Sequence, residues 1–515
     1  MLTGCDIDAV RDATDNFDLI IQLEEIETYA IGNILDAETD EPVTATVEVT
    51  FEGDDASLLI DYYSDPVSSM SVKGGFFGVG VSAGVHASPQ APVRVNVLAR
   101  ANGYEDAIVP LVITSAGENS FDLYLTPRNR PVTGTARQEV VQNSVDGRVE
   151  ATAVETAPEQ TSGASARIEI DAQNRLLDAD GRALSGQIRT SLSYYSPRAS
   201  ASLAAFPGGF NAPQVEDDRG KRSAGIMTAG FVNVGATGAD GRAAARFENP
   251  VRHVIELPES GTNPVTKAPY AAGDELSVLH FDAQRGVWKA IATAKVDAAA
   301  GKASGTNTVA FSSTATGFHA VGSLTDACEG WDLVVQRNGH RGSIVVTVTG
   351  EDGGFRRRVD IPAGKDRVTL SGMPDGAAFS LDIRTPDGEV VTQRVTPACG
   401  GVEVVSLPAP TSQPTDVLVT VDFSCTLRLQ PPFNATLKYK RVGEPGAGVT
   451  AGTPDWRVDE HGRVVGGSLE VPGMYLNQNY RVTLITPEDT ESRDVFIDSA
   501  DFFYDVDVPG DLCRR

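Results

Sequence analysis

The chain has 515 residues, which is too long for one hydrophobic core, so its length predicts several domains. Hydrophobic residues make up 41% and charged residues 22%, a composition that supports packed interiors and excludes a wholly disordered protein. The 43 Lys and Arg residues face 70 Asp and Glu residues, giving a net charge of −27. Such an acidic surface repels phosphate backbones and anionic headgroups, so we expect no nucleic-acid partner and no electrostatic membrane docking.

The N-terminus reads Met-Leu-Thr-Gly-Cys and is followed by an acidic stretch. It resembles the lipobox that ends a bacterial lipoprotein signal, which implies that Cys5 is lipidated and that residues 1–16 are a lipobox remnant and tether. The basic and apolar regions of a signal are missing, so we interpret Met1 as an artificial or misplaced start. The alternative is an ordinary free thiol at Cys5. Acidic residues after a lipidated cysteine are compatible with surface export or with inner-membrane retention, and the sequence leaves both open.

From Phe17 onward, apolar and polar residues alternate with period two, as in half-buried strands. Similar short runs recur to the C-terminus, separated by Asp-Gly and Asn-Gly dipeptides that favour tight hairpin turns. Long helical apolar stripes and apolar runs of about 18 residues are absent, so we expect no transmembrane helix. The pattern predicts an all-β chain of serial Ig-like or transthyretin-like β-sandwich domains.

The first predicted domain, residues 17–128, has a characteristic order of short motifs. These are Gly32 with Asp36-Ala37, Pro42-Val43, a strand, and Gly103-Tyr104 after a later strand. This order resembles the carboxypeptidase regulatory-like domain, a small transthyretin-like sandwich found on bacterial surface proteins. The resemblance implies architecture only, because that domain carries no catalytic residues of its own.

The middle of the chain is less distinctive. Residues 129–165 are rich in Thr, Ala, Glu, Gln and Ser, so we interpret them as a linker with one added strand near Gly147–Ala151. A central β domain is expected at 166–322. Its motifs, among them Phe206–Gly209 and Gly286–Trp288, loosely resemble the extracellular β domain of cartilage intermediate layer proteins.

The C-terminal third contains an internal repeat at an offset of 101 residues. Gly372-Met373 matches Gly473-Met474, and the apolar alternation that begins at Phe379 matches the one at Tyr480. This register predicts a duplicated β-sandwich, repeat 1 at 323–408 and repeat 2 at 417–515. The intervening linker, 409–416, is Pro-rich, so we expect an extended spacer between separate beads.

Four of the five cysteines lie in the repeats, two in each copy. The duplication favours Cys328–Cys399 and Cys425–Cys513 disulfides, and closing the first loop would stabilise by roughly 4 kcal/mol. The alternative is four reduced, buried thiols. The odd cysteine, Cys5, is explained by lipidation.

Several short patterns resemble parts of chemical sites. Gly80–Gly84 matches the Gly-x-Ser-x-Gly nucleophile elbow, but the Pro-containing segment after it cannot form the required helix. The acidic stretches at Asp178–Gly181 and Asp498–Asp511 suit calcium, yet neither completes a binding loop, so solvated turns are favoured. The six histidines are scattered singly, which argues against zinc: His86, His253, His280, His319, His340 and His461. The three tryptophans, Trp288, Trp331 and Trp456, are interpreted as core anchors rather than sugar platforms.

These observations favour a non-enzymatic outer-membrane lipoprotein that is surface-exposed and acts as a structural or adhesive rod, with no cofactor and no metal. The alternative is a glycan- or protein-binding accessory lipoprotein of an uptake or secretion system; a hydrolase with carboxylates gathered across domains is a third class. We expect an elongated particle with the first sandwich nearest the membrane and the repeats outermost. Exposed sheet edges would then serve self-association or capture of a partner strand.

Overall fold

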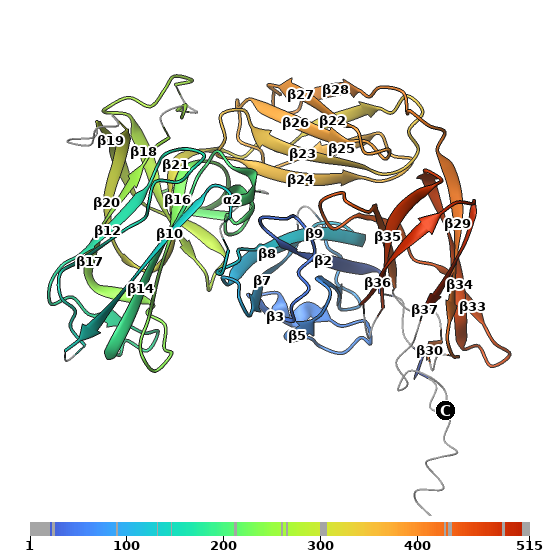
Figure 1. Cartoon of the computed structure of the whole chain (residues 1–515), viewed down its shortest axis with the longest axis horizontal. Coiled ribbons are helices and arrows are strands. Elements are labelled where there is room, and N and C mark those ends of the chain that lie inside the picture. The colour runs from blue at the N-terminus through green and yellow to red at the C-terminus, as the bar shows by residue number, and fades with distance from the viewer. Residues whose placement is uncertain are drawn as a thin grey trace, which may run out of the picture.

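The computed structural model is built almost wholly from β-strands, as the sequence predicts. It describes residues 21–22 and 26–506, except 89–90, 131, 146, 211–213, 259–260, 264–265, 299–305, 427–428, 431–434 and 487–489. Four modules follow one another along the chain and are coloured from blue to red in Figure 1. Within the described residues, no helix is long and apolar enough to cross a membrane.

The first module is a sandwich of two four-stranded sheets, β4-β6-β2-β9 and β5-β3-β7-β8. Its elements are β2 (Thr28–Asp36), β3 (Val47–Glu52), the 3-10 turn η1 (Ala56–Leu58), β4 (Leu59–Ile60), β5 (Ser69–Val72), β6 (Phe76–Val81), β7 (Val93–Ala101), β8 (Ala107–Ile113) and β9 (Gly117–Leu125). Alternating residues of β3 and β7 face inward, and Val47, Val49 and Val97 are fully buried. The first strand, β2, pairs in parallel with the last, β9.

The two C-terminal modules share one topology, as the sequence repeat predicts. Repeat 1 contains β22 (Trp331–Gln336), β23 (Ile344–Gly350), β24 (Arg356–Ile361), β25 (Arg367–Leu370), β26 (Phe379–Arg384), β27 (Val390–Val395) and β28 (Val402–Ser406). Repeat 2 contains β29 (Thr415–Phe423), β31 (Thr436–Arg441), β32 (Val449–Gly452), β33 (Asp455–Val458), β34 (Val464–Met474), β35 (Gln478–Ile485), β36 (Thr490–Ile497) and β37 (Asp501–Val506). In each copy the first strand lies between an antiparallel neighbour and the parallel last strand. The matched methionines, Met373 and Met474, are both buried.

The first module has the same strand order as the repeats, which the sequence did not indicate. The sheet β6-β2-β9 corresponds to β25-β22-β28 and to β34-β29-β37. Likewise, β5-β3-β7-β8 corresponds to β24-β23-β26-β27 and to β32-β31-β35-β36. The chain therefore carries three modules of one topology, interrupted by a different central module.

The central module is one long sheet that folds over on itself, in the order β10-β14-β16-β21-β18-β19-β20-β17-β12-β11. Its elements are β10 (Thr135–Ser144), β11 (Thr152–Glu155), β12 (Ala166–Ile170), β13 (Leu176–Leu177), β14 (Gly186–Tyr195), α2 (Ser200–Ala204), β15 (Gln214–Asp217), β16 (Gly220–Thr237), β17 (Arg246–Glu256), β18 (Glu275–Asp282), β19 (Val287–Ala298), β20 (Asn307–Ala315) and β21 (Gly317–Asp326). The long strand β19 pairs with both β18 and β20, and one apolar core fills the space between the two faces.

The segment expected as a linker, 129–165, belongs to this sheet instead. Strand β10 pairs with β14 over ten residues, and β11 pairs with β12. Instead of the one added strand expected near Gly147–Ala151, the chain forms two strands, β10 before this segment and β11 after it. Strand β10 is polar because it is an edge strand with mostly exposed or half-buried side chains, so its composition resembles that of a loop.

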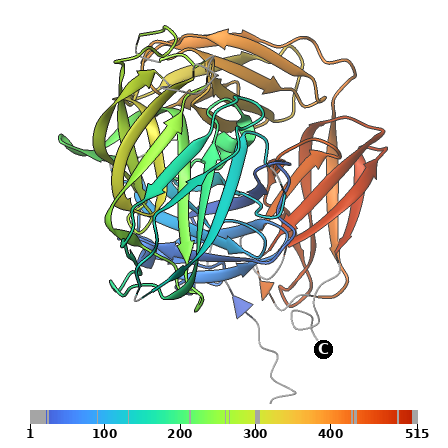
Figure 2. The same cartoon turned by 60° about the vertical axis from the view of Figure 1, so that its left-hand side comes forward.

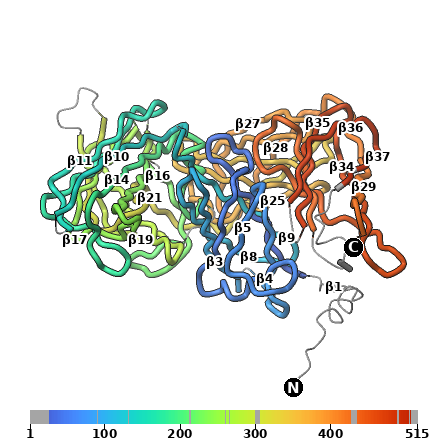
Figure 3. Tube along the Cα trace, turned by 60° about the horizontal axis from the view of Figure 1, so that its bottom comes forward, coloured from blue at the N-terminus to red at the C-terminus, as the bar shows by residue number. Residues whose placement is uncertain are grey.

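The modules pack against one another rather than forming a rod. In Figures 1 and 3 the first module lies between the central module and repeat 2. Repeat 1 lies above the first module in Figure 1 and behind it in Figure 3. The turned view in Figure 2 also shows the central module, repeat 1 and the first module side by side. One hydrophobic core runs from the central module into repeat 1, where the rings of Phe210 and Phe355 lie 5.2 Å apart. The expected elongated particle with small interfaces is therefore wrong for this structure.

The two repeats also contact each other, so they are not separate beads. His340 of repeat 1 lies 3.3 Å from the Tyr475 hydroxyl of repeat 2, and its other ring nitrogen lies 3.1 Å from the Pro408 carbonyl. Gly473 approaches the backbone of Gly342 so closely that a Cβ on it would lie 2.1 Å from the Gly342 nitrogen. Near the chain start, β1 (Ile21–Gln22) pairs in parallel with β30 (Leu429–Gln430) of repeat 2. This pairing places repeat 2 next to the start of the described chain.

Candidate binding site at the module junction

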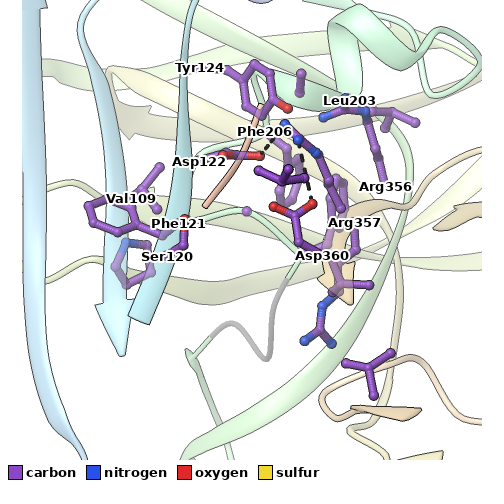
Figure 4. A pocket seen from close by; sticks show the side chains of 18 of the residues that line it. Val109, Ser120, Phe121, Asp122, Tyr124, Leu203, Phe206, Arg356, Arg357 and Asp360 are labelled. Carbon is purple, nitrogen blue, oxygen red and sulfur yellow. Dashed lines mark hydrogen bonds and ion pairs between the residues drawn. The ribbon is translucent and has the colours of Figure 1, made fainter. Parts of the chain in front are cut away.

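A cavity of about 450 Å³ lies where the four modules meet (Figure 4). The first module contributes β8 and β9, the central module contributes α2 and the loop after it, repeat 1 contributes β24, and repeat 2 contributes β32. Each of the strands β8, β9, β24 and β32 is the outermost strand of its sheet. The junction therefore covers four sheet edges that would otherwise expose backbone donors and acceptors.

Strand β24 supplies three consecutive arginines, Arg356, Arg357 and Arg358. The Arg358 guanidinium lies 3.5 Å from Asp122 of the first module and 3.6 Å from Asp360. Burial alone would lower the pKa of Arg358, but the carboxylates of Asp360 and Asp122 outweigh it and raise that pKa. Arg358 is therefore the charged link between repeat 1 and the first module.

Arg356 makes a second set of contacts on the same side of β24. Its guanidinium lies 3.7 Å from Asp40 and 4.8 Å from the centre of the Tyr124 ring. Its Nε donates to Ser200 of α2 at 2.8 Å. This side chain therefore joins repeat 1, the first module and the central module through an ion pair, a cation–π contact and a hydrogen bond.

Lysines of repeat 2 extend this network across the first module. Lys438 is buried, and its Nζ donates to Asn33 Oδ1 at 3.1 Å, while Asn33 Nδ2 donates to Asp122 at 2.8 Å. Burial lowers the pKa of Lys438, and the carboxylates of Asp360, Asp122 and Glu118 oppose that shift. The contacts run from Lys438 through Asn33 and Asp122 to Arg358, so three modules share one polar network.

Arg357 differs from its two neighbours. Its Nη1 donates to the Ser371 carbonyl and lies 3.9 Å from Met373 Sδ. Among the described residues no carboxylate forms an ion pair with it; the dashed lines in Figure 4 meet Asp122 and Asp360, and none meets Arg357. Burial is the sole cause that lowers the pKa of Arg357, to about 10. The junction thus holds one guanidinium without a counter-ion.

A second cavity, about 1180 Å³, separates the first module from the central module. Most of its charged side chains are paired; for example, Arg100 lies 3.0 Å from Asp106, and Arg189 lies 2.9 Å from Glu139. Asn129, Ser191 and other neutral polar side chains complete the wall, together with aromatic ones. This cleft is polar and most of its charges are paired, which suits a neutral polar ligand.

Three histidines that the sequence presents as scattered come together in the central module. His280 and His319 are register partners on β18 and β21, and His253 faces them from β17. The centre of the His319 ring lies 4.8 Å from the centre of the His253 ring and 4.8 Å from that of the His280 ring. The rings are tilted against one another, and within the described part of the chain no group of His, Cys, Asp or Glu side chains has metal-binding geometry.

Burial controls the charge of these histidines. His253 and His319 are 1% and 0% exposed, and among the described residues both ring nitrogens of His253 and Nδ1 of His319 have no hydrogen-bond partner. Burial, aided by the nearby His280, lowers the pKa of His253 to about 3. The pKa of His319 is held well below its ordinary value by burial and by the other two rings, and burial also lowers that of His280. No sequence spacing indicated this cluster, because strand register alone creates it.

The cysteines are only partly described. Cys328 and Cys399 form a disulfide with Cα atoms 5.4 Å apart. Cys5 and Cys513 lie outside the described residues, so lipidation and the Cys425–Cys513 pair stay predictions.

The other patterns found in the sequence have structural roles. Ser82 of the Gly80–Gly84 motif donates to the Leu58 carbonyl, and a turn rather than a helix follows it. Asp178 lies 2.6 Å from Arg242 and Asp180 pairs with Arg182, so arginines neutralise the first acidic stretch. Part of Asp498–Asp511 lies outside the described residues. Trp288 and Trp331 are buried, whereas Trp456 is half-buried and stacks on Phe423.

No family model matches this sequence, and no curated protein matches it. Similar solved structures include the Bacillus anthracis TIE protein, at 12% identity, covering 74% of this chain and 59% of that chain, with a TM-score of 0.14. BcpA, the major pilin subunit of Bacillus cereus, has 6% identity over 93% of this chain and 99% of its own, with a TM-score of 0.14. A streptococcal ancillary pilin has 10% identity over 47% and 94%, with a TM-score of 0.14. Matches this distant carry no inference about function.

Proposed function

We propose that the chain is a non-enzymatic structural or adhesive protein of a bacterial cell surface, in which four β modules act as one rigid unit. The observation that supports this is the buried polar network from Lys438 to Arg358. It joins side chains that are up to 405 positions apart in sequence, and it lies beside the junction that four edge strands line. A surface protein that resists pulling and proteolysis benefits from such closure, because unpaired edges and loose linkers are the usual weak points.

Anchoring is the second part of the proposal. A lipid on Cys5 would hold the protein in the outer membrane, facing outward. The first module would be a carboxypeptidase regulatory-like domain; its two four-stranded sheets and its motif order support that assignment. The strand pairing of β1 with β30 would bring the first module and repeat 2 close to the anchor together.

Partner binding by strand addition is the third part of the proposal. The junction covers β8, β9, β24 and β32, but β27, β28, β36 and β37 are also outermost strands. They carry exposed apolar side chains, including Val402 at 53% and Phe503 at 68% exposure. These edges would be the sites of self-association or of capture of a partner strand.

The experiment is surface labelling of intact cells of the native bacterium, followed by mass spectrometry of the N-terminal peptide. We expect antibody labelling without permeabilisation, a lipidated Cys5, and weaker cell attachment when the gene is deleted. Recovery of the chain in the cytoplasm with an unmodified Cys5 would overturn the proposal.

A binding role is the second candidate, and the 1180 Å³ cleft favours it. A glycan- or protein-binding accessory lipoprotein would use this neutral, polar space. Array screening of the soluble chain tests it. Binding that is lost on substitution of Asn129 would support the accessory role, and an array with no signal would count against it.

A further inference from the structure

Two buried side chains from different modules meet end to end. Lys438 of β31 in repeat 2 is 1% exposed, and its Nζ donates to Oδ1 of Asn33 in β2 at 3.1 Å. Among the described residues no carboxylate forms an ion pair with Lys438, whereas Lys440, two positions on, lies 2.6 Å from Glu41. A buried ammonium with a neutral acceptor is costly, and burial lowers the pKa of Lys438. This environment shifts Lys438 towards the neutral amine, which is the nucleophilic form of lysine.

The Asn33 carboxamide is held at both of its ends. It is 3% exposed, and its Nδ2 donates to Asp122 Oδ1 at 2.8 Å and to Ser120 Oγ at 3.3 Å. The carbonyl oxygen therefore faces the amine of Lys438, while the amide nitrogen faces a carboxylate. A carboxylate in that position can carry a proton to the amide nitrogen as its bond to carbon breaks. Folding also holds the two reacting groups in contact, which removes much of the entropic cost of their encounter.

The surroundings shield this contact from water on one side and open it to a cavity on the other. Asn33 lies on the same face of β2 as Ile31 and Leu35, which are 0% exposed in an apolar cluster that repeat 2 completes. Ser120 and Asp122, by contrast, line the junction cavity (Figure 4). Water is thus kept from competing with the amine, and a small product released on the Nδ2 side reaches the cavity.

We propose that Lys438 and Asn33 form an isopeptide bond, a side-chain amide that joins repeat 2 covalently to the first module. The Nζ lone pair attacks Asn33 Cγ, and the C=O electron pair moves onto Oδ1. Asp122 takes a proton from Nζ and passes it to Nδ2. The carbonyl then re-forms, the Cγ–Nδ2 bond breaks, and ammonia leaves through the cavity. Ammonia is protonated in water, which balances the proton that the Lys438 ammonium gave up, so the reaction needs no oxidant and no further reactant.

The bond would make the contact between the first module and repeat 2 permanent, because it links positions that are 405 residues apart. It is chemistry of the chain itself. It therefore goes beyond the surface role proposed above and does not depend on it.

Intact-mass spectrometry of the soluble chain, reduced and denatured, tests the bond together with peptide mapping. We expect a mass below the sequence mass by one ammonia, about 17 Da, and one branched peptide that contains Asn33 and Lys438. Lys438→Arg and Asn33→Ala should each show the full mass of their own sequence. The matched control is Lys440→Arg, because Lys440 is a buried lysine of the same strand that pairs with Glu41; this variant should still lose ammonia.

The proposal would be overturned by an unsubstituted chain at its full sequence mass, with Asn33 and Lys438 found only in linear peptides. A loss of ammonia that maps to a linear peptide, as in a succinimide, or that persists in Lys438→Arg would do so as well. If a variant does not fold, the unsubstituted chain still gives the answer, because the branched peptide is read from its own digest. Asp122→Asn removes the proton carrier and should leave most chains without the bond; cross-linking as complete as in the parent would refute the role of Asp122.

Discussion

Acidification should loosen the central module through its buried histidines. The pKa of His253 is about 3 in the folded protein, against an ordinary value of 6.5. Below pH 6.5 His253 binds a proton in the unfolded chain but stays neutral in the folded protein, so the free energy of unfolding falls as the pH falls. Between pH 7.5 and pH 5.0 this loss is about 2 kcal/mol for His253 alone. His319 acts in the same direction, because its pKa is also held well below the ordinary value.

The assay is chemical unfolding followed by the fluorescence of Trp288, in a background where Trp331 and Trp456 are replaced by Phe. Trp288 is buried in the central module, so it reports on that module. His253→Phe removes the titrating group and should reduce the loss between pH 7.5 and pH 5.0 by about 2 kcal/mol. His86→Phe, at an exposed position of the first module, is the control and should leave the loss unchanged. An identical pH dependence in the parent and in His253→Phe would refute the reasoning.

Three further outcomes are expected. Arg358→Met leaves Asp122 and Asp360 without their cation and should lower the free energy of unfolding of the full chain by about 3 kcal/mol, measured by chemical denaturation. The control Arg394→Met, at an exposed ion pair, should lower it by less than about 0.5 kcal/mol. Equal losses in the two variants would contradict the network. Reduction of the Cys328–Cys399 disulfide, which spans 71 positions, should lower the free energy of unfolding of repeat 1 by roughly 4 kcal/mol. Hydrogen exchange of β22 and β28 with and without reductant measures this loss. Unchanged protection would show that the disulfide does not stabilise repeat 1. In Gly473→Ala the new Cβ would clash with the Gly342 backbone and separate the two repeats, so protease should cleave the 409–416 segment faster. Gly376→Ala has a similar positive φ but no atom near its Cβ, so it should not change cleavage. Equal cleavage of the two variants would show that the contact between the repeats is not tight.

The sequence was a good guide wherever the information is local. Alternation of apolar and polar residues marks the strands, because each strand buries one face. The repeat was visible since both copies bury the same kinds of side chain, such as Met373 and Met474, at one offset. The Cys328–Cys399 pair followed from that duplication.

Relations between distant segments were beyond the sequence. The first module shares the topology of the repeats but no matching residue pattern, because many sequences satisfy one β-sandwich. Strand β10 looked like a linker, since an exposed edge strand needs few apolar residues. The histidine cluster depends on the register of β18 with β21, and the junction depends on how modules dock. Nothing in the sequence around Lys438 or Asn33 indicates that the two side chains form a hydrogen bond.

The central claim is that the four modules form one packed unit, locked at the junction. Small-angle scattering of the soluble chain with Cys5 removed tests it most directly. We expect a curve that the packed arrangement in Figure 1 reproduces at every salt concentration, because the network of Arg358 and Lys438 is shielded from solvent. A curve typical of an extended string of four beads, with independent motion of the repeats, would contradict it.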